Sequence, residues 1–227
     1  MLTRRELLVS SIAALMCPRS AIANVMATQK LTWPAFRVEM LKLAESAVNK
    51  SAEQVKVASL GLQILNQLDT NSNEFQQAID ASYETGNRYW LWQRMIKEPQ
   101  LNGGILTVDS NQLVQLHDHP GATGIVRIIS GEAEVWQFDE ISNINGRVDL
   151  QRTSHRILKA GDTAVLTPDS GNIHALRAVS KECRMLDFFI PPYQRRHRSW
   201  YVPQEHNWFE LEHVSCKKIL QQDYMDV

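Results

Sequence analysis

Two hydrophobic patterns divide the chain into a helical region and a β-rich region. From about residue 30 to residue 85, apolar residues recur every three or four positions, as they do along one face of a helix. From residue 87 onward they fall in short runs rich in β-branched and aromatic residues, separated by turn-forming residues. We therefore expect a helical segment at residues 24–86, packed on a β domain at residues 87–227 that includes a C-terminal extension.

Three helices are expected in the first region. Pro34 suits the first turn of a helix, and Phe36 and Met40 continue it at helical spacing. Ser51 and Gln54 have the spacing of a capping box, which predicts that a second helix begins at Ser51. A third, short helix is predicted at residues 73–83.

The β-rich region predicts a mainly β fold. Its turn signals include Ser130-Gly131 and Asn145-Gly146, and short strands at this rhythm are typical of an antiparallel sandwich or a closed barrel. The predicted strands are residues 89–94, 104–108, 113–119, 124–129, 132–138, 148–158, 163–166, 173–179 and 184–190.

The first 23 residues have the pattern of an export signal. Arg4 and Arg5 precede an apolar stretch at residues 7–16, and Ala21-Ile22-Ala23 has the small-x-small form of a cleavage site. The paired arginines resemble a twin-arginine signal, which predicts export in the folded state to a bacterial periplasm. The apolar stretch is too short to cross a bilayer as a helix, so no stable membrane span is expected.

Composition and charge limit the possible partners. The chain has 227 residues and a formal net charge of -1, so we expect one domain with an accessory segment and no nucleic-acid partner. The most basic stretch, Arg195-Arg196-His197-Arg198, is interpreted as a solvated loop. Cys183 and Cys216 remain after signal cleavage, and the sequence leaves open whether they pair.

The most informative stretch contains His117, Asp118 and His119. On a strand, side chains two residues apart point to the same face, so both histidines can face one metal while Asp118 faces the other way. His174 follows later in the chain, after Gly161, Pro168 and Gly171.

These residues resemble the two motifs of the cupin superfamily. The first cupin motif places a glutamate ligand four or five positions after its second histidine and a glycine seven positions further on. Here Gly124 stands at the glutamate position and Gly131 at that glycine. The second motif corresponds to Gly161 through His174, with two gaps each one residue longer than in the family. The resemblance implies a cupin double-stranded β-helix, or jelly-roll, barrel whose metal ligands are His117, His119 and His174, without a carboxylate.

The missing carboxylate narrows the resemblance to the cupin-type thiol dioxygenases, in the branch of cysteamine dioxygenase and the plant cysteine oxidases. Three stretches in the same order carry it: Leu116 to Gly121, Gly171 to His174, and Asp187 to Tyr193. The resemblance implies one Fe(2+) per chain and an enzyme, expected to be monomeric, that adds O2 to a thiol to give a sulfinic acid. Three neutral imidazoles would leave the metal its full double charge, which favours a thiolate as a further ligand.

The resemblance also implies that Asp187 and Tyr193 are catalytic residues that lie close to the iron without binding it. Cysteamine dioxygenase has a cysteine two residues before a tyrosine that can form a cross-link, but here Ser199 holds the cysteine position before Tyr201. An arginine that binds a substrate carboxylate is expected in cysteine dioxygenases. Arg94 and Arg127 are available, but the sequence does not give their direction.

Two other functions stay open at this point. The chain could be a cupin metalloenzyme with a non-thiol substrate, or a non-enzymatic cupin that binds a metal or a small molecule. The thiol is also undetermined: cysteine, cysteamine, an N-terminal cysteine of a peptide and 3-mercaptopropionate all remain candidates.

Overall fold

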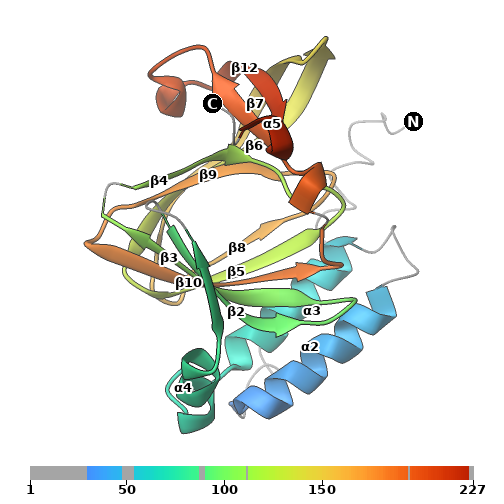
Figure 1. The fold of residues 1–227 in the computed structure, drawn as a ribbon, viewed down its shortest axis with the longest axis vertical. Coiled ribbons are helices and arrows are strands. Elements are labelled where there is room, and N and C mark those ends of the chain that lie inside the picture. The colour runs from blue at the N-terminus through green and yellow to red at the C-terminus, as the bar shows by residue number, and fades with distance from the viewer. Residues whose placement is uncertain (1–29, 48–53, 87–89, 111, 194, 225–227) are drawn as a thin grey trace, which may run out of the picture. The chain divides into compact units, whose positions relative to one another are not determined.

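The helices of the first region pack against one sheet of the β domain. The computed structural model describes residues 30–47, 54–86, 90–110, 112–193 and 195–224, and from Leu31 onward these form one compact unit. Helix α2 spans Trp33–Ala47, α3 Gln54–Gln67 and α4 Asn73–Asp80. Figure 1 shows α2 and α3 on the side of the sheet that faces away from strands β4 and β9. The predicted start of the second helix at Ser51 lies outside the described residues.

The end of the helical region differs from the prediction. Helix α4 begins after Ser72, whose hydroxyl accepts a hydrogen bond from the Phe75 backbone N–H at 3.2 Å. It ends at Asp80, not near residue 83, because the chain turns there into strand β1, Tyr83–Gly86, which pairs with strand β2. The extended conformation is stabilised by this pairing, which the local helical spacing could not reveal.

The first sheet has six antiparallel strands in the order β1-β2-β3-β10-β5-β8. Its helix-facing side chains, among them Ile105, Ile125 and Phe188, form one buried cluster with Phe36 and Met40 of α2. This burial explains the helical apolar stripe. The other strands of this sheet are β2 Trp90–Lys97, β3 Asn102–Asp109, β5 Thr123–Ser130, β8 Thr163–Leu166 and β10 Glu182–Ile190.

The second sheet closes on itself in the order β11-β12-β7-β6-β9-β4, where β11 returns to β4 through the pair Trp200 and His117. One face of these strands encloses a separate core that includes Trp136 and Phe138, and the other face is turned toward the first sheet. The strands are β4 Leu113–His117, β6 Glu132–Ile144, β7 Arg147–Lys159, β9 Ile173–Ala178, β11 Ser199–Pro203 and β12 His213–Leu220.

The mainly β barrel with N-terminal helices is confirmed. The β6–β7 hairpin turns at Asn145 and Gly146, whose φ angles of 54° and 81° are those of the Asn-Gly turn that the sequence indicated. Strands β11 and β12 were not predicted. They belong to the C-terminal extension, which also holds the short helices η3 Arg195–His197, η4 Trp208–Glu210 and α5 Gln221–Tyr224.

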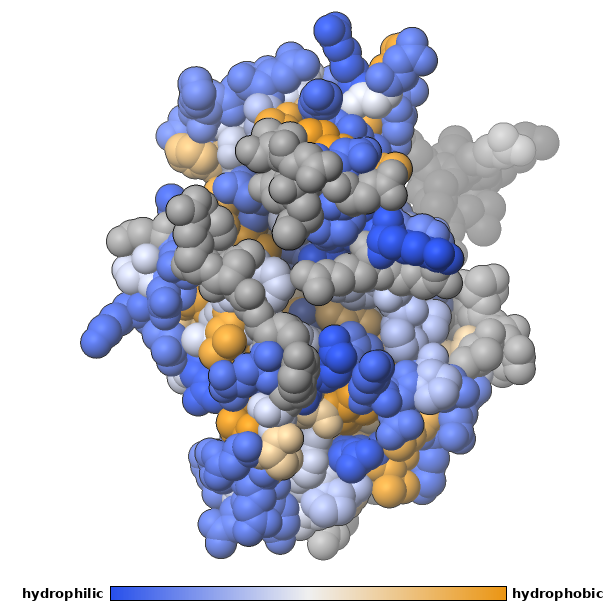
Figure 2. Space-filling view, viewed as in Figure 1, coloured by the Kyte–Doolittle hydropathy of each residue, from blue (hydrophilic) through white to orange (hydrophobic). Residues whose placement is uncertain are grey.

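The molecular surface and the two cysteines complete the description. Hydrophilic side chains cover most of the coloured surface in Figure 2, with apolar residues in small groups between them. Cys183 and Cys216 are free, buried thiols in two different core clusters, which settles the pairing question for the described residues. No helix among the described residues is both long and apolar enough to cross a membrane.

Candidate metal centre

Three buried histidines meet on the face of the second sheet that is turned toward the first sheet. His117 ends β4 and pairs directly with His174 of β9, and His119 lies just beyond the end of β4. One potential ligand atom from each residue lies within 4.8 Å of those of the other two, and the three residues are 4%, 3% and 7% exposed. This geometry can bind one metal ion.

Backbone carbonyls fix the orientation of two of the rings. His117 donates from Nδ1 to the Gln115 carbonyl at 2.7 Å, and His174 donates from Nδ1 to the Asn172 carbonyl at 2.8 Å. Because a carbonyl can only accept, each ring keeps its Nε2 lone pair for a metal. The Nδ1 atom of His119 is buried without a hydrogen-bond partner among the described residues, while its Nε2 lies 3.0 Å from Nη2 of Arg198.

The histidines are uncharged at neutral pH. Burial lowers the pKa of His117 and of His119 well below the ordinary value, and it lowers the pKa of His174 to about 4. The neighbouring Arg198 charge lowers all three further. Neutral imidazole is the form that binds a metal, so the donor set and its protonation state both fit a metal ion.

Hydrogen bonds hold the backbone around His119 in place. The Asn172 side chain accepts from the His119 N–H at 2.8 Å and donates to the His119 carbonyl at 3.2 Å. Asp118 faces away from the metal centre and accepts from the Ser199 N–H at 2.7 Å and from the Tyr201 hydroxyl at 3.1 Å. Asp118 therefore ties the histidine loop to β11. Sequence reasoning missed Asn172, although it lies in the stretch that ends at His174.

The three histidines open on a cavity of about 360 Å³ between the two sheets. The side chains of Trp90, Trp92 and Trp200 contribute to its lining, together with Asp187 and Tyr193. A cavity with aromatic walls and a few polar groups is typical of a small-molecule site. The structure thus brings the five site residues that the sequence suggested into one cavity.

Asp187 and Tyr193 differ in how deeply they are buried. Asp187 of β10 is buried, and its Oδ1 has no hydrogen-bond partner among the described residues. Burial raises the pKa of Asp187 to about 7, against the opposing effect of Arg198. Tyr193 is half-buried, stacks on the His119 ring with 4.4 Å between centroids, and its hydroxyl accepts a hydrogen bond from Arg198.

The prediction that Arg198 belongs to a solvated loop is wrong. Arg198 is 7% exposed and lines the cavity, because the strand that follows it, β11, pairs with β4 beside the histidines. Arg94 also lines the cavity, whereas Arg127 donates to the Leu65 carbonyl at 3.1 Å, near the end of α3. Arg196 and His197 are exposed, as expected.

Gly124 is required by packing at the position where the cupin motif has its glutamate. A Cβ atom on Gly124 would lie 2.6 Å from the Leu166 side chain of the neighbouring strand β8. A glutamate would therefore need Leu166 to move. Ser199, at the position of the cross-linking cysteine, is buried and cannot form a thioether.

The chain is similar to one protein family and to several known proteins. The PCO_ADO family model matches residues 52–222. A Dictyostelium discoideum protein named "Probable 2-aminoethanethiol dioxygenase" is 23% identical over 163 residues, covering 67% of this chain and 75% of that protein. Plant cysteine oxidase 1 of Arabidopsis thaliana is 27% identical over 112 residues, covering 45% of this chain and 38% of that protein.

A further relative and a solved structure each match less than half of this chain. The 2-aminoethanethiol dioxygenase of Mus musculus is 25% identical over 112 residues, covering 40% of this chain and 44% of that protein, so the chain spans less than half of the mouse and plant proteins. The structure of KdgF from Halomonas sp. covers 49% of this chain and 90% of its own, with 18% identity and a TM-score of 0.39. Since the family model matches well over half of the residues, the chain belongs to the PCO_ADO family of cupin thiol dioxygenases.

Proposed function

We propose that this protein is a non-haem iron(II) dioxygenase that converts a thiol to a sulfinic acid. The observation that carries the proposal is the buried, carboxylate-free group of His117, His119 and His174 at the end of a cavity, in a member of the PCO_ADO family. The relatives' names support a small thiol substrate, since they specify 2-aminoethanethiol and cysteine.

The charge of the donor set supports a thiol substrate. Three neutral imidazoles leave a divalent metal its full charge, and a soft, anionic thiolate is a favourable further ligand. His117, His119 and His174 would hold the iron, one per chain. When bound, it would supply the activation of O2 that no side chain can provide.

The reaction balances without another reductant. A thiolate, RS⁻, and O2 combine to RSO2⁻: two sulfur–oxygen bonds form, the O–O bond breaks, and sulfur gives four electrons to oxygen. The protein residues would therefore orient the reactants, exclude water and accept the thiol proton, without supplying electrons.

Asp187 and Tyr193 are suited to a role in proton transfer and positioning. The Asp187 carboxyl, with a pKa near 7, can hold or release a proton inside the cavity close to neutral pH. The Tyr193 ring covers one side of His119, and its hydroxyl is held by Arg198. We propose that both would contact the thiol substrate or O2.

Oxygen uptake by the iron-loaded protein tests this function. With a panel of small thiols under labelled dioxygen, we expect a product about 32 mass units heavier, with both added atoms from the gas. A disulfide without incorporated oxygen would contradict the dioxygenase. If no thiol reacted while iron stayed firmly bound, the protein would be a non-enzymatic metal-binding cupin.

The Asp187→Asn variant tests the role of the buried carboxyl. We expect turnover to fall by about 10- to 100-fold with most of the iron retained, because an outer group tunes the metal more than it holds it. Asp109→Asn, at an exposed carboxyl, is the matched control. Equal rates in the two variants would remove Asp187 from the catalytic residues.

We also propose that residues 1–23, which lie outside the described residues, direct export to the periplasm through a twin-arginine route. A reporter that works only after folded translocation, fused to residues 1–30, should be exported. Arg4→Lys with Arg5→Lys should block its export and Arg19→Lys should not, because the receptor recognises the arginine pair. Export of the double-lysine variant would point to the general secretory route.

A further inference from the structure

The second sheet changes from polar to apolar along the cavity. His174 of β9 pairs with Gln137 of β6, and both line the cavity at the histidine end. Side chains two residues apart on a strand share a face, so the next cavity-facing pair on these two strands is Leu176 and Val135. One step of about 7 Å along the strands thus replaces an imidazole and an amide by two aliphatic side chains.

The first sheet makes the same change on the opposite wall. Asp187 of β10 pairs with Val126 of β5, and two residues along the same strands Met185 pairs with Ile128. Met185, Ile128 and Leu176 belong to one hydrophobic cluster, so the apolar parts of the two walls meet between the sheets. The residues that line this apolar end of the cavity, as we call it, are Ile128, Val135, Leu176 and Met185.

Apolar side chains at and beside the apolar end still have exposed surface. Val126, Val135 and Ala164 are only partly buried, although they pack against the same cluster and line the cavity. Their strand neighbours Ile125 and Trp136 are buried on the opposite faces of the two sheets, so the exposed surface of Val126 and Val135 faces the cavity. The apolar end therefore has room for part of a ligand.

The chemistry of the apolar end favours hydrocarbon over charge. None of the four residues that line it has a nitrogen or oxygen atom in its side chain, and the backbone groups of their strands bond to neighbouring strands. The nearby amide of Gln137 already donates from Nε2 to the carbonyls of Val165 and Gly171, at 2.8 Å and 3.2 Å. An ammonium or carboxylate group buried there would lose its hydration without gaining a partner, whereas a methylene group gains from burial.

We propose that the apolar end holds an apolar chain of the substrate, so that the enzyme acts on thiols that carry such a chain. This inference rests on the proposed thiol dioxygenase function and names its substrate class. The thiol would lie at the histidine end, and its chain would extend along the strands toward Leu176 and Met185. The cavity volume of about 360 Å³ lies within the range of pockets that enclose ligands much larger than 2-aminoethanethiol. The specificity would thus differ from that named for the Dictyostelium and mouse relatives.

The test compares ethanethiol, 1-butanethiol and 2-aminoethanethiol with the iron-loaded full-length protein. Dissociation constants are measured without oxygen, and oxygen uptake is measured separately. Each buried methylene should tighten binding by about fourfold, so 1-butanethiol should bind roughly 15-fold more tightly than ethanethiol. It should also bind more tightly than 2-aminoethanethiol, whose ammonium group has no partner at the apolar end. Equal binding of ethanethiol and 1-butanethiol, or tighter binding of 2-aminoethanethiol, would overturn the inference.

A variant places the chain within the cavity. Val135→Phe fills part of the apolar end and should reduce the ratio between 1-butanethiol and ethanethiol binding to less than about threefold. Val179→Phe is the matched control, because Val179 is 49% exposed, and it should keep the wild-type ratio. An unchanged ratio in Val135→Phe, or the same reduction in Val179→Phe, would overturn the placement of the chain.

A measurement on the metal-free wild-type protein covers the case in which Val135→Phe does not fold. In calorimetry, 1-butanol should bind more tightly than ethanol by about the same factor as the thiols, with a negative heat-capacity change. Equal binding of the two alcohols would overturn the inference, while oxygen uptake with 2-aminoethanethiol would leave the dioxygenase intact. If 1-butanol bound as expected and no thiol caused oxygen uptake by the iron-loaded protein, the proposed function would fail and not the assignment of the apolar end.

Discussion

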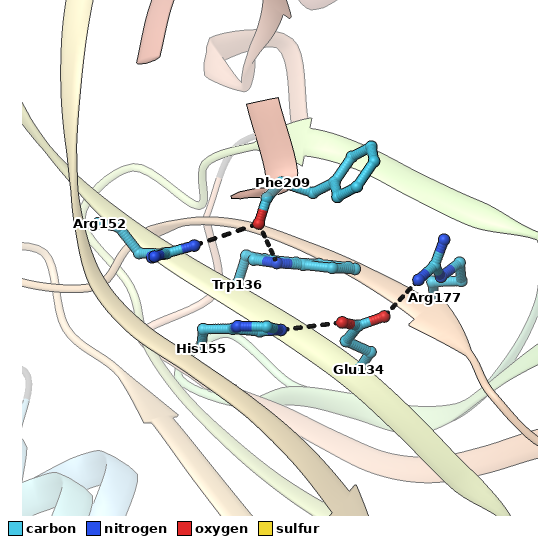
Figure 3. Close-up of polar contacts among 6 residues, drawn as sticks. All are labelled: Glu134, Trp136, Arg152, His155, Arg177 and Phe209. Atoms are coloured by element: carbon cyan, nitrogen blue, oxygen red, sulfur yellow. Dashed lines mark hydrogen bonds and ion pairs between the residues drawn. The ribbon is translucent and has the colours of Figure 1, made fainter. Parts of the chain in front are cut away.

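The closed second sheet carries histidines on both of its faces, in two different surroundings. On the cavity face, His174 meets His117 and His119 with no carboxylate between them. On the other face, Glu134 lies 2.8 Å from His155 of β7 and 2.5 Å from Arg177 of β9, beside the Trp136 ring (Figure 3). The sheet thus separates a group that can bind a metal from a group that already has its partners.

Exposure and partners, not residue type, distinguish the two groups. His155 stacks on Trp136 at an interplanar angle of 9°, its side chain is 40% exposed, and Glu134 satisfies one ring nitrogen. The cavity histidines are buried, and their pKa values are lowered by that burial. A histidine with a carboxylate partner and access to water has no unused lone pair aimed at neighbouring histidines, so it offers no comparable site.

Removing a histidine from each face gives the largest expected contrast. His174→Ala, like His117→Ala or His119→Ala, should abolish iron binding, because two nitrogens cannot complete a facial site. His155→Ala should keep close to one equivalent of iron per chain. Metal analysis of the purified proteins measures both. Full iron content in His174→Ala would show that the third ligand is another residue.

Shortening a core side chain on the face opposite the cavity should lower the stability of the fold and leave the iron content unchanged. Phe138 is fully buried within the closed sheet, so Phe138→Ala should cost about 3–5 kcal/mol in the free energy of unfolding. Ile141 on the same strand is 54% exposed, and Ile141→Ala should change stability by less than about 0.5 kcal/mol. Denaturant titration measures both. Loss of iron from folded Phe138→Ala would show that the two faces are coupled.

The sequence predicted the cavity face well because its signals are local. The alternation expected of a strand places His117 and His119 together and turns Asp118 away. The structure has this arrangement, although β4 ends at His117 and not at residue 119 as predicted. The glycine at position 124 indicated a donor set without glutamate. These inferences needed only the spacing of neighbouring residues and a resemblance in three stretches.

The residues that the sequence did not reveal depend on contacts between distant parts of the chain. Arg198 belongs to a basic run that by composition favours solvent, and it is buried only because β11 pairs with β4 at Trp200 and His117. Asn172 holds His119 from 53 positions away. The pairing of strand β12 with β7 joins segments far apart in the sequence, for example His213 with Gln151, and local patterns do not reveal such a pairing.

Acid should destabilise the metal-free protein through the cavity histidines. In the folded state the pKa of His174 is about 4, below the ordinary 6.5, so the unfolded chain takes up its proton first as the pH falls. The stability that His174 contributes is therefore present above pH 6.5 and lost as the pH falls toward 4, by roughly 3 kcal/mol. Chemical denaturation across this pH range measures it, and His174→Asn should flatten the dependence.

The Asp187→Asn variant sharpens that measurement. The raised pKa of Asp187 makes the folded state bind more protons between pH 3.8 and about 7, so this carboxyl stabilises the fold as the pH falls. Asp187→Asn should therefore make the acid loss steeper. A slope in Asp187→Asn that is unchanged or shallower would show that this carboxyl does not bind an extra proton in the folded state.

The smallest effect is expected from Arg177, the cation of the outer group. Its side chain is 42% exposed, and it combines an ion pair to Glu134 with a position 5.5 Å from the Trp136 ring centroid. Partly exposed pairs of this kind contribute about 0.5–1 kcal/mol, so Arg177→Met should lower the free energy of unfolding by that amount. The difference from wild type should shrink in 1 M salt, because the Debye length there is about 3 Å and the salt screens the ion pair. Iron content should not change, because Arg177 and His174 are three positions apart on β9 and alternation turns their side chains to opposite faces of the sheet. A loss of iron in folded Arg177→Met would show that the outer group positions His174 through the strand, and the two faces would then act as one site.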